Sequence, residues 1–233
     1  MCHFPILLAR LPARQSGQVN SRWGGIAWLG IPYAGAVDGA HRWTAPQPPQ
    51  AWGPAPFDAT QWPVGCLSSH HNPDVANVTT ENCLNLNVYV PDGATDDAAL
   101  PVLFWIHGGG FAEGANTGPY DLYQGNHMAA TAKVIVVAVN YRLGAFGFLA
   151  LSSGTETLRG NFGLMDQQLG ECLFSCVCAF ALPRGFYALL RVLAVRLHFF
   201  SLPPQRCVGC RGMRARLAAT RRTWCSGASR PAQ

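Results

Sequence analysis

Three consecutive glycines near the middle of the chain follow a short apolar run, in Trp105–Phe111, WIHGGGF. Residues 102–106 are all apolar and stand between Pro101 and these glycines, a pattern typical of a strand buried on both faces. Glycines after such a strand let the backbone turn with φ > 0 and approach a ligand closely. A turn of this kind has two main chemical uses: cradling a phosphate, or pointing N–H groups at a developing oxyanion.

The phosphate interpretation fits poorly. Gly108, Gly110 and Gly114 miss the G-x-G-x-x-G spacing, and the loop runs into FAEGANTGPY, which is rich in turn formers, instead of opening a helix. The HGGG form instead matches the lipase and esterase motif that supplies part of the oxyanion hole in α/β-hydrolases. A plain tight turn is the alternative for these residues taken alone.

Five further segments occur with the glycine motif in a characteristic order. The six are GIPYA (30–34), APQPPQAW (45–52), ENCLNLNVYVP (81–91), WIHGGGF (105–111), VNYRLGAFGFL (139–149) and GNFGLMDQQL (160–169). With them the chain resembles the type B carboxylesterases, the carboxylesterase and cholinesterase branch of the α/β-hydrolases. The resemblance covers about residues 19–169, roughly the first third of a usual family member.

Hydrophobic patterning over the same region predicts an α/β fold. Short strands are expected within residues 19–32, and the alternation over residues 84–90 predicts a half-exposed antiparallel strand. Strand 102–107, a helix within 120–132 and strand 134–139 predict a parallel pair with a right-handed crossover. We therefore expect a mixed sheet with parallel central strands, the N-terminal portion of an α/β-hydrolase.

The resemblance implies which residues carry chemistry and which are missing. The N–H groups of Gly109 and Gly110 would be oxyanion donors, while His107 holds the loop position and not that of the base. None of the ten serines has glycine at both −2 and +2, so there is no G-x-S-x-G, and the acid and catalytic histidine of the family lie beyond residue 169. The lineage reaction is carboxylic ester hydrolysis through an acyl-serine, without cofactor or metal, on a carboxylic ester substrate. The 233-residue chain itself is predicted to be inactive; the alternative is a non-catalytic, cholinesterase-like binding or adhesion module.

The resemblance also implies three contacts, each between two residues. Two ion pairs are implied, Arg42 with Glu81 and Arg142 with Asp166, and one disulfide, Cys66–Cys83. The disulfide loop contains the glycosylation sequon Asn77-Val78-Thr79, and a bridge with a sequon favours the secretory route. Cholinesterases place a tryptophan in this loop for a quaternary ammonium group, whereas SSHHNPDVANVTTEN has no aromatic residue. A general carboxylesterase ancestor is therefore expected.

Composition changes abruptly where the resemblance stops. Residues 1–169 carry 7 Lys and Arg against 11 Asp and Glu, while residues 170–233 carry 10 against 1 and hold six of the nine cysteines. We expect three segments: 1–18, a poor signal sequence; 19–169, the carboxylesterase domain; and 170–233, a basic Cys- and Arg-rich tail unrelated to the family. Gly170-Glu171 could be encoded by GGT-GAG, a splice-donor sequence, so the tail is interpreted as translated intron or a wrong reading frame.

The tail suggests no partner. Cys207-x-x-Cys210 lacks a second pair for zinc, and the arginines form no nucleic-acid motif, so neither metal nor nucleic acid is expected. No run of 18 apolar residues is uninterrupted by charge, so no membrane span is expected either.

Overall fold

The computed structural model describes residues 18–19, 24–50, 57–68, 78–95, 100–116, 124–153, 156–158 and 160–181, all within one compact unit, His3–Ala194. The predicted segment 1–18, apart from Gln18, and most of the predicted tail therefore lie outside the described residues. The elements run in the order β1 (Gln18–Val19), β2 (Ile26–Pro32), η1 (Gly39–His41), β3 (Gly65–Cys66), β4 (Thr79–Thr80), β5 (Asn85–Val90), β6 (Val102–Ile106), α2 (Asn126–Ala132), β7 (Ile135–Val139), α3 (Gly144–Phe148), β8 (Leu151–Ser153), β9 (Glu156–Leu158) and α4 (Phe162–Ala181).

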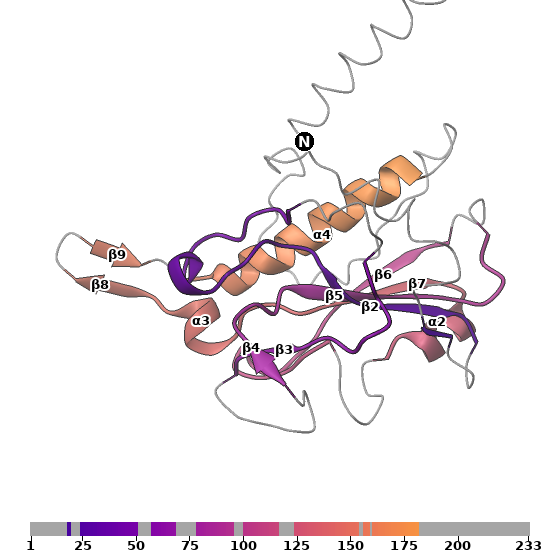
Figure 1. The fold of residues 1–233 in the computed structure, drawn as a ribbon, viewed down its shortest axis with the longest axis horizontal. Coiled ribbons are helices and arrows are strands. Elements are labelled where there is room, and N and C mark those ends of the chain that lie inside the picture. The colour runs from indigo at the N-terminus through magenta and orange to yellow at the C-terminus, as the bar shows by residue number, and fades with distance from the viewer. Residues whose placement is uncertain are drawn as a thin grey trace, which may run out of the picture. The chain divides into compact units, whose positions relative to one another are not determined.

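A five-stranded mixed sheet forms the centre of this unit, in the order β1-β2-β5-β7-β6 (Figure 1). β6 and β7 pair in parallel, with Phe104 opposite Val137, and α2 lies between them in the chain as the crossover. The predicted parallel pair is thus present. Within the described residues it lies at one edge of the sheet, and the central pairs are antiparallel.

Strand β5 corrects one expectation. Its alternating pattern predicted a half-exposed strand, but Asn85 and Asn87 are buried along with Leu86, Val88 and Tyr89. Hydrogen bonds allow this burial, because a buried amide is tolerated when its donors and acceptors are paired. Asn87 Oδ1 accepts from Gly30 N–H at 2.9 Å, and Asn85 Oδ1 accepts from Asn116 Nδ2 at 3.0 Å.

Both faces of the sheet are covered, as a buried β7 requires. One hydrophobic cluster contains Val137, Val139 and Tyr33 with the partly buried Leu169, and a second on the other face contains Val136 and Ala138 with Ala129 of α2. Figure 1 shows α4 across the first face and α2 on the second. Every second residue of β7 enters the same cluster, which is the period expected of a strand between two layers.

Helix α4 crosses the predicted boundary at residue 169 without interruption. Gly170 is buried, and a Cβ built on it would lie 3.2 Å from Val139 Cγ2 and 3.4 Å from Phe104 Cζ. Packing of this helix on the sheet therefore continues at least one residue past the end of the family-like region. Within the described part of the chain, no helix is both long and apolar enough to cross a membrane.

Candidate active site

The glycine loop begins where β6 ends at the sheet edge. Gly109 and Gly110 have φ of 118° and 61°, in the left-handed region that glycine adopts at no steric cost. A Cβ on Gly109 would lie 2.0 Å from the carbonyl oxygen of Glu113, whereas one on Gly108 would meet nothing within 4 Å. The loop thus requires glycine at position 109 for both conformation and space.

Two backbone donors in this loop are available to a ligand. No hydrogen bond among the described residues uses the N–H of Gly109 or Gly110. The Gly109 carbonyl, in contrast, is paired: it accepts from the N–H groups of Ala112 at 3.0 Å and Glu113 at 3.1 Å. Adjacent, unpaired N–H groups at a fixed backbone are what an oxyanion needs for stabilisation.

Phe111 fixes the far side of the loop. It has φ of 62°, uncommon for a residue with a side chain, and its carbonyl accepts from Gly144 N–H at 2.7 Å. Its ring lies 4.8 Å from that of Phe148 in α3. These contacts hold the backbone that follows the two donors, so the donors are positioned before any ligand binds.

His107 lies inside the loop, with 2% of its surface exposed. Its ring stacks on Tyr141 with centroids 4.4 Å apart, and Nδ1 is 2.9 Å from the Gly108 carbonyl. A carbonyl can only accept, so Nδ1 carries a proton. Burial lowers the pKa of His107 to about 4. The side chain therefore packs as a neutral part of the loop, although it stands next to the glycines.

A cluster of buried amides connects the end of the loop to the sheet. Asn116 N–H donates to Asn140 Oδ1 at 2.6 Å, and the Asn116 side chain donates to Asn85 at its backbone carbonyl and Oδ1. Asn140 follows β7 and also donates to Val64 O at 3.0 Å. The roles of Asn116, Asn140 and Tyr141 were not predicted from the sequence. Asn140 and Tyr141 lie in the VNYR segment, which indicated only the family resemblance, and Asn116 lies in FAEGANTGPY, which was noted only for its turn formers.

The first implied ion pair forms near the surface. Arg42 Nε and Nη2 donate to the two Glu81 oxygens at 2.6 and 2.5 Å, with side chains 37% and 19% exposed. The hydrogen bond lowers the pKa of Glu81 and raises that of Arg42. The Arg42 guanidinium also lies 5.6 Å from the Trp43 ring and 5.8 Å from that of Phe146. Water screens an exposed pair of this kind, so its role is to hold the Arg42 segment against residues 80–83.

The second implied ion pair is buried. Arg142 Nε and Nη2 each lie 2.8 Å from a different Asp166 oxygen, and the Arg142 backbone N–H donates to Oδ2 at 3.0 Å. The two side chains are 3% and 0% exposed. Burial raises the pKa of Asp166, while the Arg142 hydrogen bonds favour its charged form. The pair joins the segment after β7 to α4, with the Phe162 ring 5.3 Å from the guanidinium.

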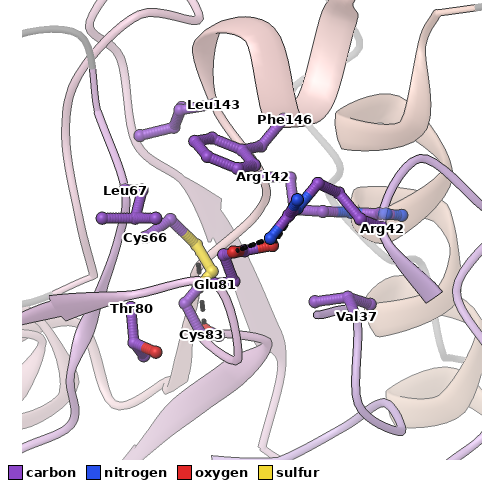
Figure 2. A pocket seen from close by; sticks show the side chains of 10 residues that line it. All are labelled: Val37, Arg42, Cys66, Leu67, Thr80, Glu81, Cys83, Arg142, Leu143 and Phe146. Atoms are coloured by element: carbon purple, nitrogen blue, oxygen red, sulfur yellow. Dashed lines mark hydrogen bonds and ion pairs between the residues drawn. A yellow bond between two sulfur atoms is a disulfide. The ribbon is translucent and has the colours of Figure 1, made fainter. Parts of the chain in front are cut away.

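The predicted disulfide is present and lies beside both arginines. Cys66 and Cys83 are bonded and buried, and they line a cavity of about 10 Å³ with Arg42, Glu81 and Arg142, as Figure 2 shows. This volume holds about one water molecule. The cavity is too small for an ester and belongs to the structural contacts rather than to the glycine loop.

One predicted residue lies outside the described chain. Asn77, the glycosylation candidate, falls within residues 69–77, which the structure does not describe. Within the described ranges no group of three His, Cys, Asp or Glu side chains is arranged to hold a metal ion. The glycine loop is the feature of the described chain that is suited to chemistry.

Comparison with known proteins agrees with this geometry. The para-nitrobenzyl esterase of Bacillus subtilis is 44% identical over 147 residues, 60% of this chain and 28% of that protein. The acetylcholinesterase of Electrophorus electricus is 40% identical over 156 residues, 62% of this chain and 24% of that protein. The chain thus spans about a quarter of the length of these relatives.

Solved structures and a family model give the same result. A thermophilic PNB esterase superposes with a TM-score of 0.58 at 40% identity, over 67% of this chain and 32% of that one. The model of the carboxylesterase family matches residues 14–170. The chain therefore belongs to the carboxylesterase family and carries its α/β-hydrolase fold.

Proposed function

We propose that residues 24–170 form the oxyanion-binding part of a carboxylic ester hydrolase. The observation that carries this proposal is the pair of N–H groups at Gly109 and Gly110. No described residue accepts a hydrogen bond from either group, and both glycines have φ in the left-handed region. The names of the two relatives above, an esterase and a cholinesterase, support a reaction at a carboxylic ester.

The reaction of this lineage proceeds through an acyl-serine. A serine Oγ attacks the ester carbonyl, a histidine takes the Oγ proton, and the carbonyl oxygen becomes an oxyanion. Gly109 and Gly110 would donate to that oxygen, and neutral, buried His107 would keep their backbone in place. The tetrahedral intermediate then collapses, and the alcohol leaves with the proton from that histidine. Water hydrolyses the resulting acyl-serine to the carboxylic acid and regenerates the serine.

The nucleophile has no candidate in these 233 residues, because none of the ten serines lies in G-x-S-x-G. The third oxyanion donor is the N–H after that serine, so it is missing as well. We therefore propose that this polypeptide, taken alone, does not hydrolyse esters. Both relatives carry enzyme names, and no observation favours the binding-module alternative.

Ester class follows from the loop between Cys66 and Cys83. Its fifteen residues from Ser68 to Asn82 contain no aromatic side chain, so no cation–π contact to a quaternary ammonium group can come from this segment. A neutral ester is therefore the proposed substrate class, as opposed to a choline ester.

A chimera tests the proposal. Residues 24–170 replace the aligned segment of the Bacillus subtilis para-nitrobenzyl esterase. The remaining sequence of that esterase would supply the nucleophilic serine, the acid and the catalytic histidine. We expect the chimera to hydrolyse a nitrobenzyl ester, because the loop would complete the oxyanion hole. A chimera that shows a cooperative thermal transition yet hydrolyses nothing would refute the assignment of Gly109 and Gly110.

A further inference from the structure

We infer that His107 makes the glycine loop acid-labile: protonation of its imidazole opens the loop while the sheet stays folded. Acid-dependent opening would regulate the site, which goes beyond ester hydrolysis. Its consequence for catalysis rests on the proposed function, whereas the opening itself is measured without any substrate.

Among the described residues, one nitrogen of the His107 ring has a hydrogen-bond partner and the other has none. Nδ1 donates to the Gly108 carbonyl at 2.9 Å, so the other nitrogen, Nε2, has the free lone pair. Nε2 is buried and has no hydrogen-bond partner among the described residues. A proton added to Nε2 would create a buried cationic donor with nothing to accept from it, which is strongly unfavourable.

The packing around the ring leaves little space for a compensating water. Gly114 closes the loop over the ring so tightly that a Cβ there would lie 2.3 Å from Nδ1 and 2.8 Å from Cε1. Tyr141 stacks on the ring and also donates from its hydroxyl to the His107 carbonyl at 2.9 Å. The imidazolium could gain solvent only by leaving this packing.

The charges on the surrounding elements do not compensate either. The loop itself carries Glu113, the segment after β7 carries Tyr141 and Arg142, α3 has no charged residue, and α4 contributes Asp166, which is bound to Arg142. None of these charges contributes to the pKa of His107: burial lowers it, and the Gly108 carbonyl opposes the lowering in part. Among the residues that the structure describes, no carboxylate is therefore in place to stabilise the imidazolium.

The consequence is a loop that opens as pH falls. In the open loop His107 would titrate near its ordinary value of 6.5, and in the closed loop near 4. The equilibrium constant for loop closure is therefore at its full value above pH 6.5. Below that pH it falls by about tenfold per pH unit until about pH 4, roughly 300-fold in all. The oxyanion donors would be disassembled under acidic conditions in which the rest of the fold persists.

Amide hydrogen exchange on the 233-residue chain tests this inference. The N–H groups of Ala112, Glu113 and Gly144 are bonded across the loop, so their protection reports closure. Between about pH 7 and pH 4.5, after correction for intrinsic rates, their protection should fall roughly 100-fold while the amides of β7 keep theirs. His107→Asn keeps a donor for Gly108 but cannot titrate, so it should abolish the dependence.

Three results would overturn the inference: unchanged loop protection at the acidic pH, loss of protection in the loop and β7 together, or the same dependence in His107→Asn. If that variant does not fold, NMR titration of His107 in the unmodified chain replaces it. The loop must then open along the titration curve of His107 itself, and an opening midpoint unrelated to that curve would exclude the mechanism.

Discussion

Asp166→Asn should lower the free energy of unfolding of the 233-residue chain by about 3–5 kcal/mol, the cost of leaving one member of a buried ion pair alone. Asparagine keeps the volume of the aspartate, so the loss reports charge and hydrogen bonding rather than a cavity. The Arg142 guanidinium would stay buried, 3% exposed, with its Nη1 already lacking a partner among the described residues. Urea unfolding followed by circular dichroism gives the value.

Glu81→Gln is the matched control for that substitution. It breaks the other bidentate arginine pair, but there solvent reaches both side chains, so the loss should be much smaller. The double variant Arg142→Met with Asp166→Leu should recover most of the stability, because it removes both charges together. A loss in Asp166→Asn no larger than that in Glu81→Gln would show that the buried pair does not hold α4 to the sheet.

Gly109→Ala should cost the chimera about 10²–10³ in kcat, the usual effect of removing one oxyanion donor. The added Cβ would overlap the Glu113 carbonyl at 2.0 Å, and alanine disfavours a φ of 118°. The backbone must therefore move, and the N–H groups move with it. Steady-state kinetics on the nitrobenzyl ester measures the change.

Gly108→Ala is the control within the same three glycines. Its Cβ would meet nothing within 4 Å and its φ is ordinary, so kcat should stay close to that of the parent chimera. Gly110→Ala should fall between the two, because its Cβ has open space but its φ of 61° strains an alanine. Equal losses at positions 108 and 109 would contradict this loop geometry.

Local patterns predicted the parts of the fold that depend on neighbouring residues. The apolar run at 102–106 is β6, the run at 134–139 contains β7, and the helix expected within 120–132 contains α2. The Cys66–Cys83 bridge, which came from family resemblance, is present. The two strands and the helix are encoded in short segments whose apolar pattern is visible in one sequence, whereas the bridge required the resemblance.

Features that depend on distant residues could not be predicted in this way. Asn85 and Asn87 looked like solvent-facing positions, because an isolated asparagine in an alternating strand is normally exposed. In the structure Asn85 is paired with Asn116 and Asn140, and Asn87 donates to the Asn116 carbonyl, so their burial depends on residues tens of positions further along the chain. The neutral state of His107 likewise depends on Gly114 and Tyr141 closing around it, and no local pattern encodes that closure.

Labelling with a serine-directed fluorophosphonate tests most directly the claim that this chain carries oxyanion donors without a nucleophile. The probe reacts only with an activated serine, so it does not depend on guessing the ester. We expect no labelling of the 233-residue chain above background, and stoichiometric labelling of the chimera at its elbow serine. Stoichiometric labelling of any one serine of the unmodified chain, lost when that serine is changed to alanine, would contradict the account.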